Sequence, residues 1–290
     1  MSMARSADLR AGFGDLPAAY RDRERARVAV LPVPYDGTST WLKGADRGPQ
    51  AILDASAHLE LYDIETESEP YRLGIWTDEP VSEGSSPEAM VQAVEARVAG
   101  HLAAGRFPVV LGGEHSVTAG AVRAVVRHHP GVSVLQLDAH TDLREEYEGS
   151  PYNHACVMAR VRELAPIVQV GIRSMDAAER ASLDLSRVFF AERIQGRRDW
   201  IDGVLALLGP QVYLTFDLDA LDPSIMPSTG TPEPGGLSWY ETLELLARVG
   251  HELVGFDVVE LAPSANRAPD FLAAKLVYKL LAYRFKGEIA

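Results

Sequence analysis

Three hydrophobic segments of this chain end in closely spaced Asp, Glu and His residues that could together bind divalent metal ions. The residues are Glu114 and His115 after the first segment, Asp138, His140 and Asp142 after the second, and Asp217, Asp219 and Asp222 after the third. No Lys or Arg stands between the members of a cluster. A lone Asp after a strand is usually a turn or helix-cap residue, but three such clusters together indicate a metal site. Asp222 precedes Pro223 and is predicted to form a turn.

The charges of these residues favour two metal ions. Four carboxylates that converge in a buried site would repel one another or take up protons unless cations neutralise them. The four are Asp138, Asp142, Asp217 and Asp219, and two divalent cations would balance them. Carboxylates and imidazoles without a thiolate favour Mn²⁺, although Fe, Co, Ni and Zn remain open. Paired ions can activate a water molecule for hydrolysis.

Short apolar segments must position these side chains. Eight segments rich in Val, Ile and Leu are expected to form strands: 27–35, 72–78, 107–115, 132–140, 167–174, 187–193, 211–219 and 253–261. Most are continuously apolar, as are strands of a parallel sheet whose two faces are both covered. Alternate residues of a strand point the same way, so Asp138 should project with His140, and Asp217 with Asp219. Ligands bind beyond the carboxyl ends of parallel strands, where all three clusters stand.

Helical patterns alternate with these strands and predict an α/β fold with a mostly parallel sheet. Residues 238–250 begin with Ser238 and Glu241, which have the spacing of a capping box, and end at Gly250. No repeat or linker divides the sequence, and the clusters come from both halves. We therefore expect one domain over 1–290, with a polar N-terminal arm at about 1–26.

Composition excludes several classes of protein. The chain has 290 residues, of which 47% are hydrophobic, and 28 Lys and Arg against 41 Asp and Glu give a formal charge of −13. No basic patch is evident, so nucleic acid is not expected as a partner. A single cysteine, Cys156, cannot form an intramolecular disulfide. The absence of a secretory signal or a long apolar run predicts a cytoplasmic protein that does not enter a membrane.

Five segments of the sequence resemble the ureohydrolase family, which includes arginase and agmatinase. They read GGEHS, DAHTD, FDLDALDPSIMPSTGTPEPGG, GFDVVELAP and PYDGTSTWLKGADRGPQAI. The resemblance implies a three-layer α/β/α sandwich around an eight-stranded, mostly parallel sheet, with two Mn²⁺ per chain. It also implies a homotrimer or homohexamer. By resemblance, one ion would bind His115, Asp138, Asp142 and Asp217, and the other would bind Asp138, His140, Asp217 and Asp219.

The resemblance also implies roles for residues around the ions. Glu260 would bind the guanidinium group of the substrate, and Thr231 lies in a loop near that group. His154 would contact the substrate and relay protons, and Asp142 would transfer the proton of the attacking water. Glu114 would orient the site.

The expected reaction is hydrolysis of agmatine to urea and putrescine, a step of polyamine biosynthesis. Arginases are expected to carry Asn and Ser or Thr after DAHTD to bind the substrate carboxylate, whereas this chain has Arg144 and three Glu over residues 144–153. Such a loop suits a small cationic guanidine, although it could equally be a solvated charged loop. Aminopropylagmatine and arginine remain alternative substrates. A non-catalytic polyamine-binding regulatory protein is the alternative from another class.

Overall fold

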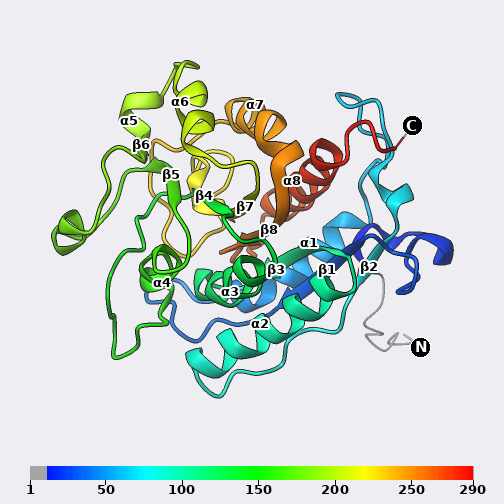
Figure 1. The fold of residues 1–290 in the computed structure, drawn as a ribbon, viewed down its shortest axis with the longest axis horizontal. Coiled ribbons are helices and arrows are strands. Elements are labelled where there is room, and N and C mark those ends of the chain that lie inside the picture. Colours follow the sequence, from blue (N-terminus) through cyan, green and yellow to red (C-terminus); the bar gives the residue numbers. More distant parts are fainter. Residues whose placement is uncertain (1–11, 290) are drawn as a thin grey trace.

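The computed structural model describes residues 12–289 and has at its centre one sheet of eight strands, all of whose pairs are parallel (Figure 1). In spatial order the strands are β2 (Ile75–Thr77), β1 (Val28–Val33), β3 (Phe107–Gly112), β8 (Leu253–Val259), β7 (Val212–Asp217), β4 (Ser133–Leu137), β5 (Ile167–Ile172) and β6 (Val188–Phe190). Each strand lies within one of the eight segments expected from the sequence. The predicted parallel sheet is therefore confirmed.

Helices cover both faces of the sheet and complete the expected three layers (Figure 1). The helices on one face are α1 (Gly48–Ser56), α5 (Ala191–Ile194), α6 (Trp200–Leu207), α7 (Trp239–Val249) and α8 (Ala268–Arg284). Those on the other are α2 (Pro87–Ala103), α3 (Thr118–His128) and α4 (Val157–Arg162). Val109 and Leu111 of β3 join the first core, whereas Val110 between them joins the second, as alternation along a strand requires. None of the helices within residues 12–289 is long and apolar enough to cross a membrane.

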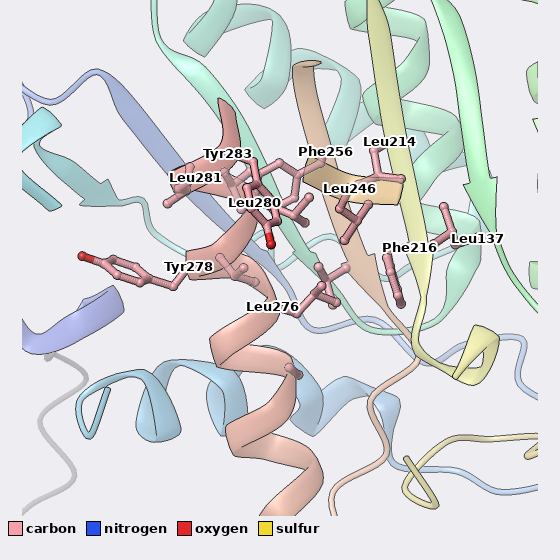
Figure 2. Close-up of a cluster of buried hydrophobic side chains, with 14 of the residues drawn as sticks. Leu137, Leu214, Phe216, Leu246, Phe256, Leu276, Tyr278, Leu280, Leu281 and Tyr283 are labelled. Carbon is pink, nitrogen blue, oxygen red and sulfur yellow. The ribbon is translucent and has the colours of Figure 1, made fainter. Parts of the chain in front are cut away.

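The last helix, α8, packs against one face of the sheet. Figure 2 shows Leu276 and Leu280 of α8 in the same apolar cluster as Phe216 of β7 and Phe256 of β8. All four side chains are fully buried, and burial of each contributes roughly 1.5–3 kcal/mol. Tyr278 of α8 belongs to the same cluster and donates its hydroxyl hydrogen to the carbonyl oxygen of Leu61, 2.5 Å away.

The N-terminal arm expected at about 1–26 is described only from residue 12 onward, and its first eleven residues lie outside the described residues. Within the described part, Phe13 and Leu16 are buried in the core of α1 and α8. The backbone N–H of Gly14 donates to Ser56 Oγ at 2.8 Å, which attaches this segment to α1. Phe13 and Leu16 therefore anchor this segment in the core.

The predicted capping box at the start of α7 is wrong. The Ser238 side chain makes no capping hydrogen bond, and the Glu241 carboxylate instead lies 3.1 Å from the guanidinium of Arg198. α7 does end next to Gly250, but that residue has helical φ and ψ angles rather than a left-handed conformation. Its lack of a side chain serves packing, since an added Cβ would lie 2.5 Å from Cβ of Tyr283 in α8.

The strand order brings distant parts of the chain to one edge of the sheet. β3 and β4 follow each other in sequence, but β8 and β7 lie between them in the sheet. The order of the strands thus reverses here, and in open α/β sheets ligands bind at such a switch point, beyond the carboxyl ends of the strands. Glu114 and His115 follow β3, Glu260 follows β8, and the two Asp-rich clusters follow β7 and β4.

Candidate active site

The first group of potential metal ligands surrounds the ring of His115. Its Nδ1 atom lies 2.9 Å from Asp142 Oδ2, 3.1 Å from Asp138 Oδ2 and 3.5 Å from Asp217 Oδ2. All four side chains are buried. Among the described residues, none gives this nitrogen a well-formed hydrogen bond. One imidazole nitrogen that faces three carboxylate oxygens fits a divalent cation.

The second group shares Asp138 with the first. His140 Nδ1 lies 3.0 Å from Asp219 Oδ2 and 3.6 Å from Asp138 Oδ1. Asp138 turns Oδ2 to His115 and Oδ1 to His140, so it could bridge two ions. Asp217 turns Oδ2 to His115, but its Oδ1 accepts the backbone N–H of Asp219 at 2.8 Å. The structure therefore brings all six candidate ligands into one cluster.

The electrostatics of this cluster are unfavourable without cations. Burial raises the pKa of Asp142 to about 7, and the charge of Asp138 adds to the shift. Burial and the neighbouring Asp219 likewise raise the pKa of Asp217 well above its usual value. Burial alone would lower the pKa of His140, but the charges of Asp219 and Asp138 raise it to about 12. Without cations, these shifts favour protonated side chains in the cluster. Metal binding would release those protons.

The ring of His115 is oriented by a chain of hydrogen bonds that sequence reasoning missed. Its Nε2 atom lies 2.8 Å from Thr215 Oγ1, and Thr215 in turn donates to Asp257 Oδ1 at 2.7 Å. Tyr213 donates to the other oxygen of Asp257 at 2.8 Å. Because the hydroxyl proton of Thr215 goes to Asp257, Nε2 of His115 must donate, which turns Nδ1 to the carboxylates. Partners of this kind commonly fix metal-binding histidines. The sequence did contain a signal for this contact: alternate residues of a strand point the same way, so Thr215 shares a face of β7 with Asp217.

Four of the candidate ligands, His115, His140, Asp142 and Asp217, form one wall of a cavity of about 300 Å³. Its other walls come from residues 39–42, 174–179 and 230–231. Thr231 and His154, both expected to contact the substrate, line this cavity. The structure therefore places the expected substrate-binding residues around one space.

Glu260 lines the cavity, is buried and is held in a strained backbone conformation. Its φ angle is 67°, in the left-handed region that is uncommon for Glu. Its Oε1 accepts the backbone N–H of His115 at 2.7 Å, while Oε2 lies on the side of Gly230. Asp142 has a φ of 52° and is strained in the same way. Such strain often accompanies functional sites.

Glu114 contacts the loop that carries residues 38 and 39 rather than a candidate metal ligand. Its carboxylate accepts hydrogen bonds from Thr38, Ser39 and Ser116. Thr38 Oγ1 also lies 3.2 Å from Nδ1 of His154. The expectation that Glu114 orients the site is therefore refined: its contacts reach His154 through Thr38.

The acidic loop does not present its glutamates to the cavity. Glu145 pairs with Arg160 and Arg162, Glu146 and Glu148 are exposed, and none of the three lines the cavity. Arg144 does line it, with its guanidinium 3.3 Å from Asp176 and above the ring of Tyr147. Of the two interpretations of this loop, solvated charges describe the glutamates better.

Two further expectations concern residues outside the ligand set. Asp222 accepts backbone N–H groups of Ser224, Gly235 and Gly236, so it forms a turn as predicted. Cys156 is buried and unpaired.

Comparison with known proteins identifies similar chains. The sequence profile of the arginase family matches residues 26–282 of this chain. An N(1)-aminopropylagmatine ureohydrolase of Thermus thermophilus is 44% identical over 279 residues, which are 93% of each chain. An agmatinase of Bacillus anthracis is 31% identical over 273 residues, 89% of this chain and 92% of the relative. The crystal structure of an agmatine ureohydrolase of Thermoplasma volcanium superposes with a TM-score of 0.84 at 35% identity and covers 91% of both chains.

Proposed function

The chain belongs to the arginase family and is a hydrolase, and from this premise we propose that it hydrolyses the guanidinium group of agmatine to release urea and putrescine. The observation that carries the proposal is the buried Glu260, whose Oε2 is available at the cavity beside the His and Asp groups. A carboxylate binds a guanidinium ion by paired, charge-assisted hydrogen bonds.

We propose that two Mn²⁺ ions bind the six candidate ligands. His115, Asp138, Asp142 and Asp217 would hold one ion, and Asp138, His140, Asp217 and Asp219 would hold the other. The buried, unpartnered Nδ1 of His115 and the excess of carboxylates over imidazoles support this assignment. When bound, the ions would supply Lewis acidity that makes a water molecule nucleophilic at neutral pH.

The side chains of this protein then have to move protons. Agmatine and water give urea and a protonated amine, so both protons of the water end on the leaving nitrogen. Asp142, at the wall of the cavity, can accept one of them from the attacking water. His154 Nδ1 faces Thr38, which leaves Nε2 for the cavity and for transfer of a proton to the departing amine.

The far end of the substrate selects among guanidines. Arg144 is the loop cation that lines the cavity, and Asp176 already pairs with it at 3.3 Å. A substrate carboxylate would therefore have to compete with Asp176 for this cation. The pairing of Arg144 with Asp176 supports a preference for agmatine over arginine as the substrate. The three glutamates of the loop do not contribute to it, because they lie outside the cavity.

N(1)-aminopropylagmatine is the second candidate substrate. The relative named for that activity is 44% identical to this chain, against 31% for the agmatinase of Bacillus anthracis. The longer molecule offers the same guanidinium to Glu260 and adds a second amine towards the cavity mouth, so the proposed chemistry is unchanged.

Urea release by the Mn²⁺-loaded protein tests the proposal. The panel is agmatine, aminopropylagmatine, 4-guanidinobutyrate and L-arginine. We expect kcat/KM for the two amine-tailed guanidines to exceed that for arginine by roughly tenfold or more, since 1.4 kcal/mol is already tenfold. Arginine as the best substrate would refute the assignment. Tight binding of polyamines without urea release would instead favour a regulatory protein.

We also propose a homotrimer or homohexamer. Light scattering coupled to size-exclusion chromatography measures the mass directly. A monomer of 31.6 kDa would contradict this proposal.

A further inference from the structure

Glu114 is a buried carboxylate that accepts four hydrogen bonds. Its Oε2 accepts the backbone N–H groups of Thr38 at 2.5 Å and Ser39 at 3.0 Å. Its Oε1 accepts the hydroxyls of Thr38 and Ser116, each at 2.6 Å. All four partners are donors, so both oxygens of the Glu114 side chain act as acceptors in this arrangement.

The hydroxyl of Thr38 has only one proton, and Glu114 receives it. Towards His154, Thr38 Oγ1 can therefore act only as an acceptor. It accepts the backbone N–H of His154 at 2.9 Å and faces the ring Nδ1 at 3.2 Å. Nδ1 must then carry the ring proton, and Nε2 of the neutral ring keeps a lone pair.

We propose that Glu114 and Thr38 are positioning residues that hold His154 in the tautomer with hydrogen on Nδ1. This inference rests on the proposed function, in which His154 exchanges protons with the substrate. In this tautomer Nε2 can first accept a proton and then deliver it to the departing amine. The other tautomer would present an N–H and could accept nothing. The network links residues 38, 114 and 154, and so connects the loop over the cavity to the proton-transfer group.

The variant Glu114→Gln tests the inference with little change in shape. Its amide oxygen can keep the two backbone N–H donors, while its NH₂ group donates to Thr38 and Ser116. The proton of Thr38 is then free to point at Nδ1 of His154, which reverses the tautomer. We expect kcat to fall roughly 10- to 100-fold, at the lower end of general acid–base effects. KM should change by less than about threefold, because Glu260 is untouched.

Further variants separate this role from a structural one. Thr38→Ser keeps the hydroxyl and should retain kcat within about threefold, whereas Thr38→Val should lose activity as Glu114→Gln does. Thr66→Val is the matched control: Thr66 also donates its hydroxyl to a carboxylate, that of Asp63 at 2.9 Å, but its partners lie outside the cavity. It should leave kcat unchanged.

The decisive experiment repeats Glu114→Gln in a His154→Ala background. If Glu114 acts through His154, its substitution should lower kcat by less than about twofold there, because residues that act as a unit are not additive. A full 10- to 100-fold loss in that background would overturn the inference.

Nitrogen NMR of the histidine rings provides a readout that does not depend on turnover. In protein loaded with diamagnetic Zn²⁺, His154 should have its proton on Nδ1, and Glu114→Gln should move it to Nε2. An unchanged tautomer would also overturn the inference. Absence of urea release from every guanidine by the wild type would refute the proposed function instead, and the NMR result would still stand.

Discussion

Replacement of Gly230 by Ala should impair catalysis without harming the fold. A Cβ at this position would lie 3.4 Å from Glu260 Oε2 and 3.5 Å from the carbonyl oxygen of Leu42. Both are ordinary contact distances, and the φ angle of Gly230 is not in the left-handed region. The methyl group would nevertheless occupy space beside the oxygen that we assign to the guanidinium.

The magnitude follows from the hydrogen bonds at stake. A hydrogen bond to a charged group is worth about 1.5–3 kcal/mol, and 1.4 kcal/mol is tenfold in rate. Loss of one such bond to Glu260 should therefore lower kcat/KM for agmatine roughly 10- to 150-fold. The melting temperature should stay the same or rise slightly, since Gly→Ala at a compatible position stabilises by about 0.4–1 kcal/mol.

Initial rates of urea release over a range of agmatine concentrations, with a thermal melt of the same sample, give both quantities. Gly100→Ala is the matched control, because within residues 12–289 no atom outside its own helix turn lies within 4 Å of the added Cβ, and Gly100 does not line the cavity. A kcat/KM within twofold of the wild type would refute the placement of the guanidinium beside Gly230. A large fall in melting temperature would mean that the substitution acts through the fold.

Other predictions concern the metal ligands and His154. His154→Ala should lower kcat by roughly 10²- to 10⁴-fold while two metal ions stay bound, and loss of metal would show that His154 is a ligand. Asp138→Asn should reduce the retention of both ions, as measured by elemental analysis, because Asp138 faces both His115 and His140; loss of only one ion would contradict a bridging role. Burial lowers the pKa of His154 from 6.5 to about 4, so the unfolded chain binds the extra proton between these values. Because protonation of His154 favours the unfolded chain, the free energy of unfolding should decrease as the pH falls from 6.5 towards 4. His154→Asn should lack that part of the pH dependence in urea titrations, and an identical dependence would refute the neutral ring.

Much of the fold could be predicted because short-range patterns determine it. Continuous apolar runs such as the one that leads to Asp138 reveal strands that are covered on both faces. The alternation of side chains then aligns Asp138 with His140. Since parallel strands end at one edge, clusters that follow different strands could be expected to meet, as they do around His115.

Contacts between distant segments could not be predicted in this way. Glu114 and Thr38 are separated by 76 positions, and nothing in either segment alone indicates that they are hydrogen-bonded. The charges of the loop after Asp142 left two interpretations open, and the pairing of Glu145 with Arg160 and Arg162 of α4, which favours solvated charges, could not be read from the loop itself. The spacing of Ser238 and Glu241 matches a capping box, but Arg198 provides a competing partner. The local sequence indicates which hydrogen-bond and ion-pair partners are possible, and tertiary packing determines which of them form.

The most direct test of the central claim is urea release from agmatine measured as Mn²⁺ is returned to chelator-treated protein, with the bound metal counted in the same samples. If the two groups that share Asp138 each hold an ion for the reaction, activity should reach its plateau only as the bound metal approaches two ions per chain. Full activity with one ion per chain, or with none, would contradict the account.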